Sequence, residues 1–483
     1  MSSDNGGIIG VVNDPTSTVA SGVWQQEEQY EAKVNDTWPQ RALFTTKSLR
    51  FDDGSSDYLN RTPSQEGSRR QLTFSCWFKK GLNAGTWTWL MHSGASNDGT
   101  PSFGVGIKSN ALSVIDLGAD GSYDINFITN RLFRDPSAWY HVVVAIDTTQ
   151  GTESNRVKIY VNGVQETSFS TAVYPSQNHD FNTGPTMTNY ATEIGRDNYN
   201  GGESYFDGYM AEIILVDGSQ LAPTSFGSTN SDGVWIPAIY TGTFGTNGFN
   251  LQFENSAALG TDSSPNGNTF TVNNLTSIDQ STDYPVVNYA TINSLDNYFY
   301  AATLSEGNLK QTANASNYSF GTSTFGVSQG KWVVEVKIES GSTVRNVIGI
   351  TDKVSTGTTN ELGSLANAWQ YSSGGTIYNN GSNIGGSYAS YTTNDIIGIY
   401  LDLDNNKLYF SKNGAVQNSG TGISITTPSS TTNGVYFFAF GDYGASDDSV
   451  NNVNFGSPAF AISSGNTDGE YGNFEYSTTI TGD

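Results

Sequence analysis

The chain has 483 residues, of which 36% are hydrophobic, 12% aromatic and only 14% charged, and 54 of them are glycine. A formal net charge of −24 argues against nucleic acid as a partner, because binding phosphates needs clustered Lys and Arg. The single cysteine, Cys76, excludes a disulfide framework within the chain and a thiolate metal cluster. This composition predicts several folded β domains with a polar, mostly uncharged surface.

Residues 1–44 alternate short apolar pieces with Pro, Gly and Ser, and are too poor in apolar side chains to bury a core of their own. Only residues 24–33 could form a helix of two or three turns. Four apolar side chains would be costly to leave in water and are the predicted docking residues: Val23, Trp24, Tyr30 and Trp38. We expect this segment to be an arm that orders against another protein, and the alternative is a disordered leader with no role.

The N-terminal segment lacks the features of a secretory signal. It carries no Lys or Arg before Lys33, and its apolar run 8–12 is too short for a signal peptide. The longest apolar runs elsewhere, around Val142 and Ile213, are far shorter than a membrane span. We therefore expect a protein that is made in a cytoplasm and does not insert into a membrane.

Residues 45–256 contain short apolar runs separated by turn residues at intervals typical of a β-sandwich. The expected strands are 48–51, 72–79, 87–92, 103–108, 139–147, 157–161, 205–216 and 248–253. The motifs SLRFDDGSSDYL, LTFSCWFKK, WYHVVVAID, VKIYVNG, EIGR and YFDGYMAEIILVDG resemble the successive strands of a laminin-G-like, concanavalin-A-like lectin domain.

A second β unit is expected at 306–457, after a turn-rich connector at 257–305 that packs on the first domain. Within the connector, Phe270, Val272 and Leu275 are a candidate closing strand of the first sandwich. Its clearest element is a hairpin at 395–414. There, apolar positions alternate over one strand, Asp404-Asn405-Asn406 favours a turn, and a second strand returns. Residues 458–483 are expected to form a polar tail.

The motifs KWVVEVKI, NVIGITD, AWQYSSGGTIYNNGS, NDIIGIYLDLDNNKLYFSKNG, YFFAFGD and VNFG resemble a SPRY domain, which is another concanavalin-like sandwich, and they follow in family order. The predicted fold class is therefore all-β, with two concanavalin-like antiparallel β-sandwiches in series behind a non-globular N-terminal arm.

The catalysis expected of such a fold is glycoside hydrolysis, which needs two carboxylates across a cleft. Asp402 with Asp404, and Glu212 with Asp217, are the candidate pairs, but Asp404 opens a turn, so we interpret the first pair as turn carboxylates. No nucleophile elbow is present. The histidines lie scattered among strands and a loop: His92, His141 and His179. We predict that the protein is not an enzyme and has no catalytic residue.

Two aromatic pairs could offer a flat plate to a sugar: Trp87 with Trp89, and Trp369 with Tyr371. The alternative is core packing, because Trp87 and Trp89 share one face of a strand. Trp369 also matches a position that is usually structural in SPRY domains.

A structural calcium ion is the one cofactor that the sequence suggests. Laminin-G-like domains often carry calcium held by loop carboxylates and carbonyls, and the oxygen-rich turns here contain Asp53 and Asp57, and Asp197 and Asp207. None has the ligand spacing of an EF-hand. Turn formation and solubility are the interpretation we favour for these residues.

The segments GGIIGVVNDPTSTVASGVWQQEEQYEA, YFDGYMAEIILVDG and GVWIPAIYTGTFGTNGFNLQF, followed by a SPRY domain, resemble structural proteins of tailed bacteriophages, particularly marine ones, of the fibre or appendage type. The resemblance implies a non-enzymatic virion protein that joins other virion proteins through its arm. It also implies contact with a host surface glycan or protein through the lectin-like domains, and a homo-oligomer, with a trimer favoured. The alternatives are a capsid decoration protein that binds mainly other virion proteins, and a glycan-active enzyme.

Overall fold

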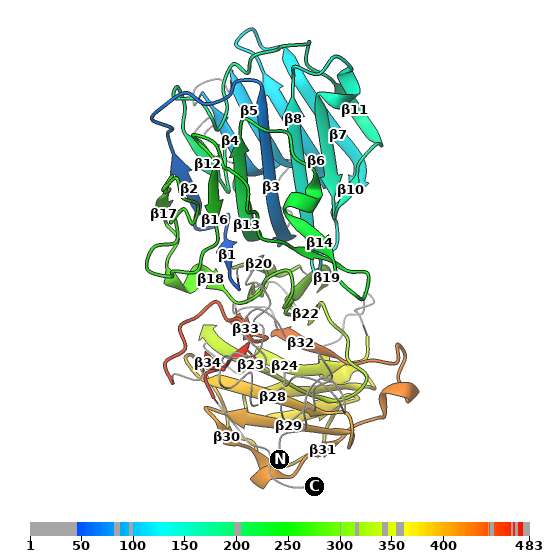
Figure 1. Ribbon diagram of the computed structural model, residues 1–483. Helices are drawn as coiled ribbons and strands as arrows, with labels where there is room; N and C mark the ends of the chain where they lie inside the picture. Colours follow the sequence, from blue (N-terminus) through cyan, green and yellow to red (C-terminus); the bar gives the residue numbers. More distant parts are fainter. Residues whose placement is uncertain are drawn as a thin grey trace, which may run out of the picture.

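The computed structural model describes residues 46–81, 87–95, 100–197, 204–299, 301–313, 318–340, 346–353, 362–442, 444, 449–464, 467–468 and 472–476. In these ranges the chain forms β-strands and short 3-10 turns but no α-helix. The strands build two antiparallel β-sandwiches, one above the other in Figure 1. This architecture confirms the predicted all-β class with two sandwiches in series. The predicted docking residues Val23, Trp24, Tyr30 and Trp38 lie outside the described residues.

The first sandwich consists of two eight-stranded sheets. One has the order β10-β9-β8-β3-β13-β1-β18, with β16 paired to β13. Its strands are β1 (Ser48–Phe51), β3 (Gln71–Lys80), β8 (Trp139–Asp147), β9 (Val157–Val161), β10 (Val164–Gln165), β13 (Gly208–Asp217), β16 (Phe249–Leu251) and β18 (Gln280–Ser281). The other has the order β11-β7-β6-β5-β4-β12-β2-β17. Its strands are β2 (Tyr58–Arg61), β4 (Trp87–Gly94), β5 (Ser102–Lys108), β6 (Ala111–Leu117), β7 (Tyr123–Leu132), β11 (Phe169–Val173), β12 (Thr192–Ile194) and β17 (Thr271–Asn273).

Strand β3 shows how the two-residue alternation builds this core. Phe74, Cys76 and Phe78 are fully buried between the two sheets, and each buried Phe contributes about 1.5–3 kcal/mol relative to an exposed one. Trp77 faces the other side and stacks on the ring of His141 at a centroid distance of 4.7 Å. A ribbon of β14 (Gly227–Thr229) and β15 (Trp235–Pro237) covers that side, so β3 is buried on both faces.

The second sandwich also has two sheets. One has the order β19-β22-β32-β24-β25-β26-β27, formed by β19 (Ile292–Phe299), β22 (Ser319–Ser323), β24 (Asn346–Thr351), β25 (Ala368–Ser372), β26 (Thr376–Asn379), β27 (Ser382–Asn383) and β32 (Phe437–Asp442). The other has the order β20-β21-β33-β23-β28-β29-β30, with β31 on β29. It is formed by β20 (Thr303–Ser305), β21 (Lys310–Thr312), β23 (Lys331–Ser340), β28 (Ile396–Asp402), β29 (Lys407–Lys412), β30 (Ala415–Val416), β31 (Ile423–Ser424) and β33 (Val450–Asn454).

The predicted hairpin is formed by β28 and β29, with Asp402 opposite Lys407 at its turn. Asn406 takes a positive φ of 53°, which the turn requires. Strand β28 lies between β23 and β29, and Ile399 and Leu401 on its inner face are 0% and 1% exposed. This confirms the interpretation of the alternation as one dry strand face.

The domain boundaries differ from the expected ones. The segment expected as a connector, 257–305, divides between the domains, because β17 and β18 complete the first sandwich whereas β19 and β20 begin the second. Part of the expected tail, 458–483, also belongs to the second sandwich. There, the buried carboxylate of Glu335 accepts the backbone N–H groups of Glu475 and Tyr476, each at 2.8 Å. A further two-stranded piece is formed by β34 (Thr467–Asp468) and β35 (Gly472–Asn473).

Buried polar contacts join the two sandwiches. Arg50 of β1 is fully buried and forms ion pairs with Asp279 at 3.2 Å and with Glu306 at 3.1 Å. The hydroxyl of Tyr209 in β13 donates to the carbonyl of Gly307 at 3.1 Å. Glu306 and Gly307 follow β20 of the second sandwich, so these contacts fix one domain against the other.

A second buried ion pair holds the crossover between the domains to the end of β3. Lys79 Nζ lies 2.8 Å from Asp283 Oδ2, and the two side chains are 0% and 2% exposed. Asp283 Oδ1 also accepts the indole N–H of Trp139 at 2.9 Å, and Lys79 donates to Asn288 Oδ1 and the Tyr289 carbonyl, each at 2.7 Å. The junction end of β3 therefore lies at Lys79, whereas Gln71 marks its far end.

Candidate functional site

Two aspartates and a histidine meet at the far end of the first sandwich, and we name Asp116, Asp124 and His179 the aspartate–histidine cluster. The Phe181 N–H donates to the Arg69 carbonyl at 2.8 Å, and Thr148 Oγ1 donates to the His179 carbonyl at 2.7 Å. These two hydrogen bonds place His179 beside the Gln71 end of β3. Because β3 rises roughly 3.3 Å per residue, the cluster lies about 30 Å from the junction. It is therefore at the end of the first domain that points away from the second (Figure 1).

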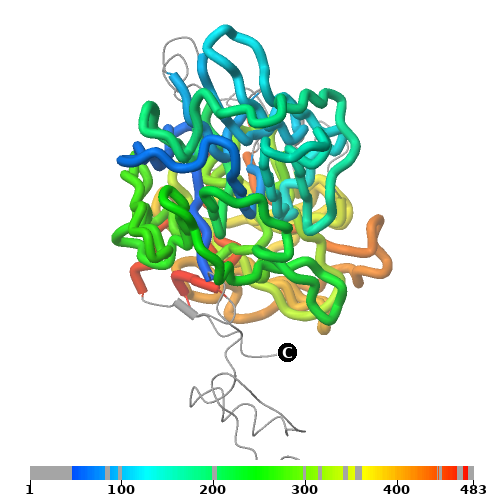
Figure 2. The backbone as a smooth tube through the Cα atoms, turned by 45° about the horizontal axis from the view of Figure 1, so that its top comes forward, coloured from blue at the N-terminus to red at the C-terminus, as the bar shows by residue number. Residues whose placement is uncertain are grey.

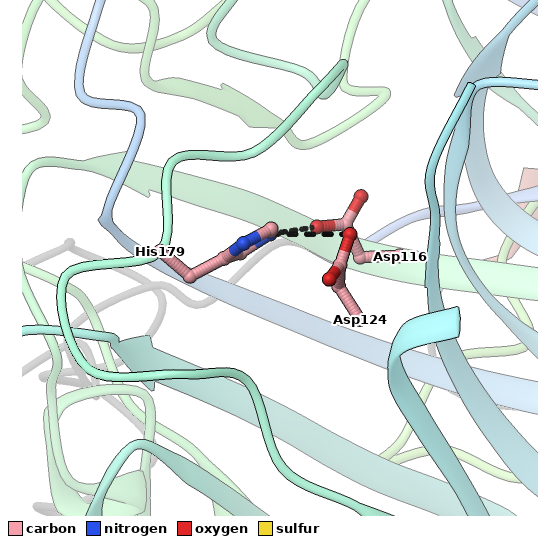
Figure 3. A group of neighbouring side chains, drawn as sticks. All are labelled: Asp116, Asp124 and His179. Atoms are coloured by element: carbon pink, nitrogen blue, oxygen red, sulfur yellow. Dashed lines mark hydrogen bonds and ion pairs between the residues drawn. The ribbon is translucent and has the colours of Figure 1, made fainter. Parts of the chain in front are cut away.

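The three side chains converge from two strands and a loop, as Figure 3 shows. His179 Nε2 lies 2.7 Å from Asp116 Oδ2 and 3.9 Å from Asp124 Oδ2. One ligand atom from each residue lies within 4.8 Å of the others. Asp116 is 0% exposed, His179 11% and Asp124 37%, so the group is closed on one side and open on the other.

A tight turn brings the two aspartates together. Asp116 lies near the end of β6 and Asp124 near the start of β7, and between them the Gly121 N–H donates to the Gly118 carbonyl at 3.0 Å. Asp120 Oδ1 accepts the N–H and hydroxyl of Ser122, at 3.0 and 2.6 Å. Gly121 has a φ of 79°, which a residue with a side chain adopts only under strain. The sequence IDLGADGSYD thus folds so that its first and last carboxylates face each other.

The charges of the cluster depend on one another. Hydrogen bonding to Asp116 raises the pKa of His179, against the opposing effect of burial. Burial raises the pKa of Asp116, although the hydrogen bond from His179 opposes this. The second oxygen, Asp116 Oδ1, is buried and has no hydrogen-bond partner within the described ranges. Two carboxylates and an imidazole nitrogen at this spacing are a donor set that can hold a divalent cation.

Sequence reasoning missed this cluster. It treated His179 as one of three scattered histidines and placed its calcium candidates in other turns. The signal that was available is a pair of aspartates, Asp116 and Asp124, on either side of a turn containing Gly118 and Gly121. The histidine gave no such signal, because it comes from a separate loop that only the tertiary fold brings to this turn.

The predicted calcium residues are placed elsewhere. Asp57 is 3% exposed and its Oδ2 accepts the backbone N–H of Asp52 at 3.1 Å. Asp197 and Asp207 are 6% and 4% exposed. Across the described ranges, the aspartate–histidine cluster is the group of three metal-ligating side chains, so neither pair, Asp53 with Asp57 or Asp197 with Asp207, gains a third such ligand.

Of the first predicted sugar-binding pair, Trp87 and Trp89, only one ring is partly accessible. Trp89 is 5% exposed because it lies flat over β5, where a Cβ added to Gly104 would come within 2.3 Å of its ring. Trp87 is half-buried and stacks on Trp89 at 5.0 Å, with Lys108 Nζ 4.5 Å from the centroid of the Trp87 ring. Of this pair, Trp87 alone keeps a partly accessible ring.

The second predicted plate is wrong, because both rings belong to the core of the second sandwich. Trp369 is 5% exposed and Tyr371 is 0% exposed. Tyr371 packs against Tyr391 at 5.0 Å and Phe410 at 5.1 Å. A buried ring has no face to offer a sugar, so the core alternative holds for this pair.

One serine and one histidine do approach each other, in an arrangement unsuited to nucleophilic catalysis. Ser75 Oγ lies 2.8 Å from His141 Nε2, and the indole N–H of Trp235 donates to His141 Nδ1 at 2.9 Å. Because Nδ1 accepts, the ring proton is on Nε2 and is donated to Ser75, so the imidazole cannot remove the serine proton. Burial also lowers the pKa of His141 to about 3.

The candidate acids Asp402 and Asp404 lie at the turn of the β28–β29 hairpin. Asp402 Oδ1 accepts the backbone N–H groups of Asp404 and Asn405, both at 3.1 Å, and its other oxygen pairs with Lys331. Asp404 Oδ1 accepts the N–H of Gly330 at 3.0 Å. Both carboxylates therefore stabilise the turn and the adjoining strand, as interpreted from the sequence.

A pocket of about 310 Å³ lies at the domain junction. It is lined by residues 134–137 of the first sandwich and by Asn293, Leu295 and Thr324 of the second. Leu295 is 70% exposed. The pocket lining includes two charged residues, Arg134 and Asp135, and neither belongs to the aspartate–histidine cluster.

Comparison with known proteins identifies both domains. Residues 53–221 match the family model of the concanavalin A-like lectin/glucanases superfamily, and residues 331–442 match the SPRY domain model. The chain therefore contains a concanavalin A-like domain and a SPRY domain, as the resemblances predicted. No curated protein sequence matches the chain. No helix among the described residues has the length and apolar character needed to cross a membrane.

Solved structures show likeness in fold alone. The SPRY domain of human HERC1 is 15% identical, with a TM-score of 0.28, and the match covers 34% of this chain and 96% of that one. A candidate carbohydrate-binding protein from Bacteroides ovatus is 17% identical, with a TM-score of 0.33, covering 48% of this chain and 59% of that one. A pentraxin from Limulus polyphemus is 16% identical, with a TM-score of 0.24, covering 35% and 79%.

Proposed function

We propose that this chain is a non-enzymatic structural protein of a virion, a fibre or appendage component that attaches the particle to a glycan on the host surface. The observation that carries the proposal is an exposed aromatic side chain at the far end of the lectin-type domain. Tyr123 is 43% exposed and directly precedes Asp124, to which the amide of Asn182 donates at 3.3 Å. An aromatic face beside carboxylate and amide groups suits a sugar, which has apolar faces flanked by hydroxyls.

The path of the chain supports an orientation in which the far end of the first sandwich points away from the particle. Ser48 of β1 donates to the Asp283 carbonyl at 2.5 Å, so the described chain enters the first domain at the junction, about 30 Å from Tyr123. In our proposal the segment 1–44 docks onto other virion proteins through its apolar residues. The far end of the first sandwich then faces outward, and several copies in a homo-oligomer, a trimer in the proposed form, present it together.

The charge of the protein favours a neutral glycan. The chain has 46 acidic and 22 basic residues, and the far end carries the two aspartates of the cluster. Anionic polysaccharides would be repelled, whereas hydroxyls of neutral sugars can hydrogen-bond to the abundant carboxylate, amide and hydroxyl groups. We therefore propose neutral hexose-containing glycans as the ligand class.

The test compares two single variants of the full chain, displayed at high density on beads to reproduce multivalent presentation. Tyr123→Ala should weaken binding to host cells and to arrays of neutral glycans by about tenfold, because it removes the stacking face. Leu132→Ala is the matched control, since Leu132 is 41% exposed on the same strand at its opposite end. Equal loss in both variants, or no binding by the unaltered chain, would overturn the glycan role.

Two further measurements test the rest of the proposal. Negative-stain imaging of particles labelled with an antibody to this chain should show label on tail appendages; label on the shell would instead support a capsid decoration protein. Incubation with the bound glycans should release no reducing sugar. Turnover of any of them would contradict the non-enzymatic assignment.

A further inference from the structure

We propose that the aspartate–histidine cluster binds one divalent first-row transition-metal ion, with Zn²⁺ as the preferred species. This inference does not depend on the attachment role, because the site is built from side chains of one domain and can be tested by metal binding alone. Figure 3 shows the two carboxylates and the imidazole facing a common point.

The spacing of the donors is close to that of a metal site. Ligands about 2.0–2.2 Å from a zinc ion in tetrahedral geometry are roughly 3.4 Å from one another. His179 Nε2 lies 2.7 Å from Asp116 Oδ2 and 3.9 Å from Asp124 Oδ2, on either side of that value. A small lengthening of the distance between His179 Nε2 and Asp116 Oδ2, with a small movement of Asp124 toward His179, would bring all three ligand atoms to tetrahedral spacing. Asp124 is 37% exposed, so it has room to move.

An unsatisfied buried oxygen is the second observation that points to a ligand. Asp116 is 0% exposed, and its Oδ1 has no hydrogen-bond partner among the residues that the structure describes. Leaving such an atom unpaired in the interior is unfavourable because its lost hydration is not replaced, so a group that compensates it is expected. A metal ion held through Asp116 would supply that compensation, either directly or through a bound water.

No basic side chain neutralises these carboxylates in the described part of the chain. Among the described residues, His179 is the ion-pair partner of both Asp116 and Asp124. The charged residue next to His179 in its own loop is also acidic. It is Asp180, whose carboxylate is paired with Arg70. A cation entering the cluster would therefore meet a net negative site.

The donor types select among metals. Calcium and magnesium prefer sites made wholly of oxygen ligands, six to eight in the case of calcium, whereas an imidazole nitrogen with two carboxylates suits zinc and its neighbours. Three protein ligands leave a coordination position for water on the open side, next to Asp124. In the metal-free form the proton on Nε2 is shared with Asp116. Binding places the Nε2 lone pair on the ion, so that proton must be released to solvent.

The experiment is titration of the full chain, freed of metal with EDTA and dialysed, with zinc chloride in a calorimeter. We expect one site per chain for the unaltered protein. Asp116→Asn and His179→Gln should each weaken binding by about tenfold or more, because each removes a ligand. Cobalt(II) absorption in the visible range should report the same stoichiometry and be displaced by zinc.

The matched control is Asp135→Asn. Asp135 accepts the N–H and hydroxyl of Ser137 at 2.8 and 2.6 Å in the type of turn that Asp120 also makes, but it lies at the junction end of the domain. It should leave zinc binding unchanged. Because the buried variants could unfold the loop, Asp124→Asn at the partly exposed position provides an independent test. Binding that is absent in the unaltered chain, or equal in Asp124→Asn and Asp135→Asn, would overturn the assignment.

Discussion

Replacing Asp283 by Asn should destabilise the junction strongly while leaving its shape almost unchanged. In the native chain, Asp283 accepts from Lys79 at 2.8 Å and from the indole N–H of Trp139 at 2.9 Å, and both partners are donors. An asparagine must turn its NH₂ group toward one of them, so a donor would face a donor. Lys79 would also lose its charge partner while staying fully buried. Breaking a buried ion pair from one side typically costs about 3–5 kcal/mol, and we expect this range.

The expected loss can be measured by urea unfolding followed through tryptophan fluorescence, since Trp139 and Trp77 report on the first sandwich. Lys79→Met with Asp283→Leu removes both charges at once and should be less destabilising than the sum of the two single changes. The exposed pair Arg70–Asp180 is the control, because Asp180→Asn should give no resolved change. A loss below about 1 kcal/mol for Asp283→Asn would refute the view that this pair is desolvated and stabilises the junction.

Three further predictions concern other parts of the chain. Burial raises the pKa of Asp57 in the folded protein to about 7. The folded state is therefore favoured at low pH, where this carboxyl is protonated, and that stabilisation is lost as the pH rises through the raised pKa. Asp57→Asn should therefore raise the melting temperature at pH 8 but leave it nearly unchanged at pH 4; an equal shift at both would contradict this. Leu401→Ala, in the central strand β28, should cost about 2–5 kcal/mol in unfolding of the second sandwich, and a change of a degree or less in its melting temperature would show that the site is not core. Deletion of residues 1–44 should leave both sandwiches folded but prevent incorporation into particles, and normal incorporation would place the docking surface elsewhere.

Sequence patterns predicted the strands well where alternation is strict and both neighbours are strands. The β28–β29 hairpin is the clearest case, since alternating apolar residues and an Asp-Asn-Asn turn define register without help from the rest of the fold. The domain boundary was less predictable. The candidate closing strand around Phe270, Val272 and Leu275 corresponds to β17 of the first sandwich. Strand β18, by contrast, has only two residues, and so short a run carries no periodicity to distinguish it from a connector.

The candidate site could be predicted only in part. The sequence pattern around aromatic side chains such as Trp369 and Tyr371 is the same whether they bind a sugar or pack in a core. Their burial depends on which other strands cover them. Carboxylates in turns are equally ambiguous. The aspartate–histidine cluster needed the turn between β6 and β7 and the separate loop carrying His179 to be placed together, which no local pattern encodes.

The two ends of the first sandwich differ in the groups that neutralise their buried carboxylates. At the junction, Asp279 and Glu306 pair with the buried guanidinium of Arg50 and Asp283 pairs with the buried ammonium of Lys79, so each of these carboxylates has a permanently charged basic partner within the protein. At the far end, the carboxylates of the aspartate–histidine cluster share one imidazole. A chain with 46 acidic and 22 basic residues cannot provide a basic partner for every carboxylate. Compensation from outside, by a metal ion, is therefore expected at the far end and not at the junction, and added zinc should stabilise the loops around His179 without altering the contacts that hold the two domains together.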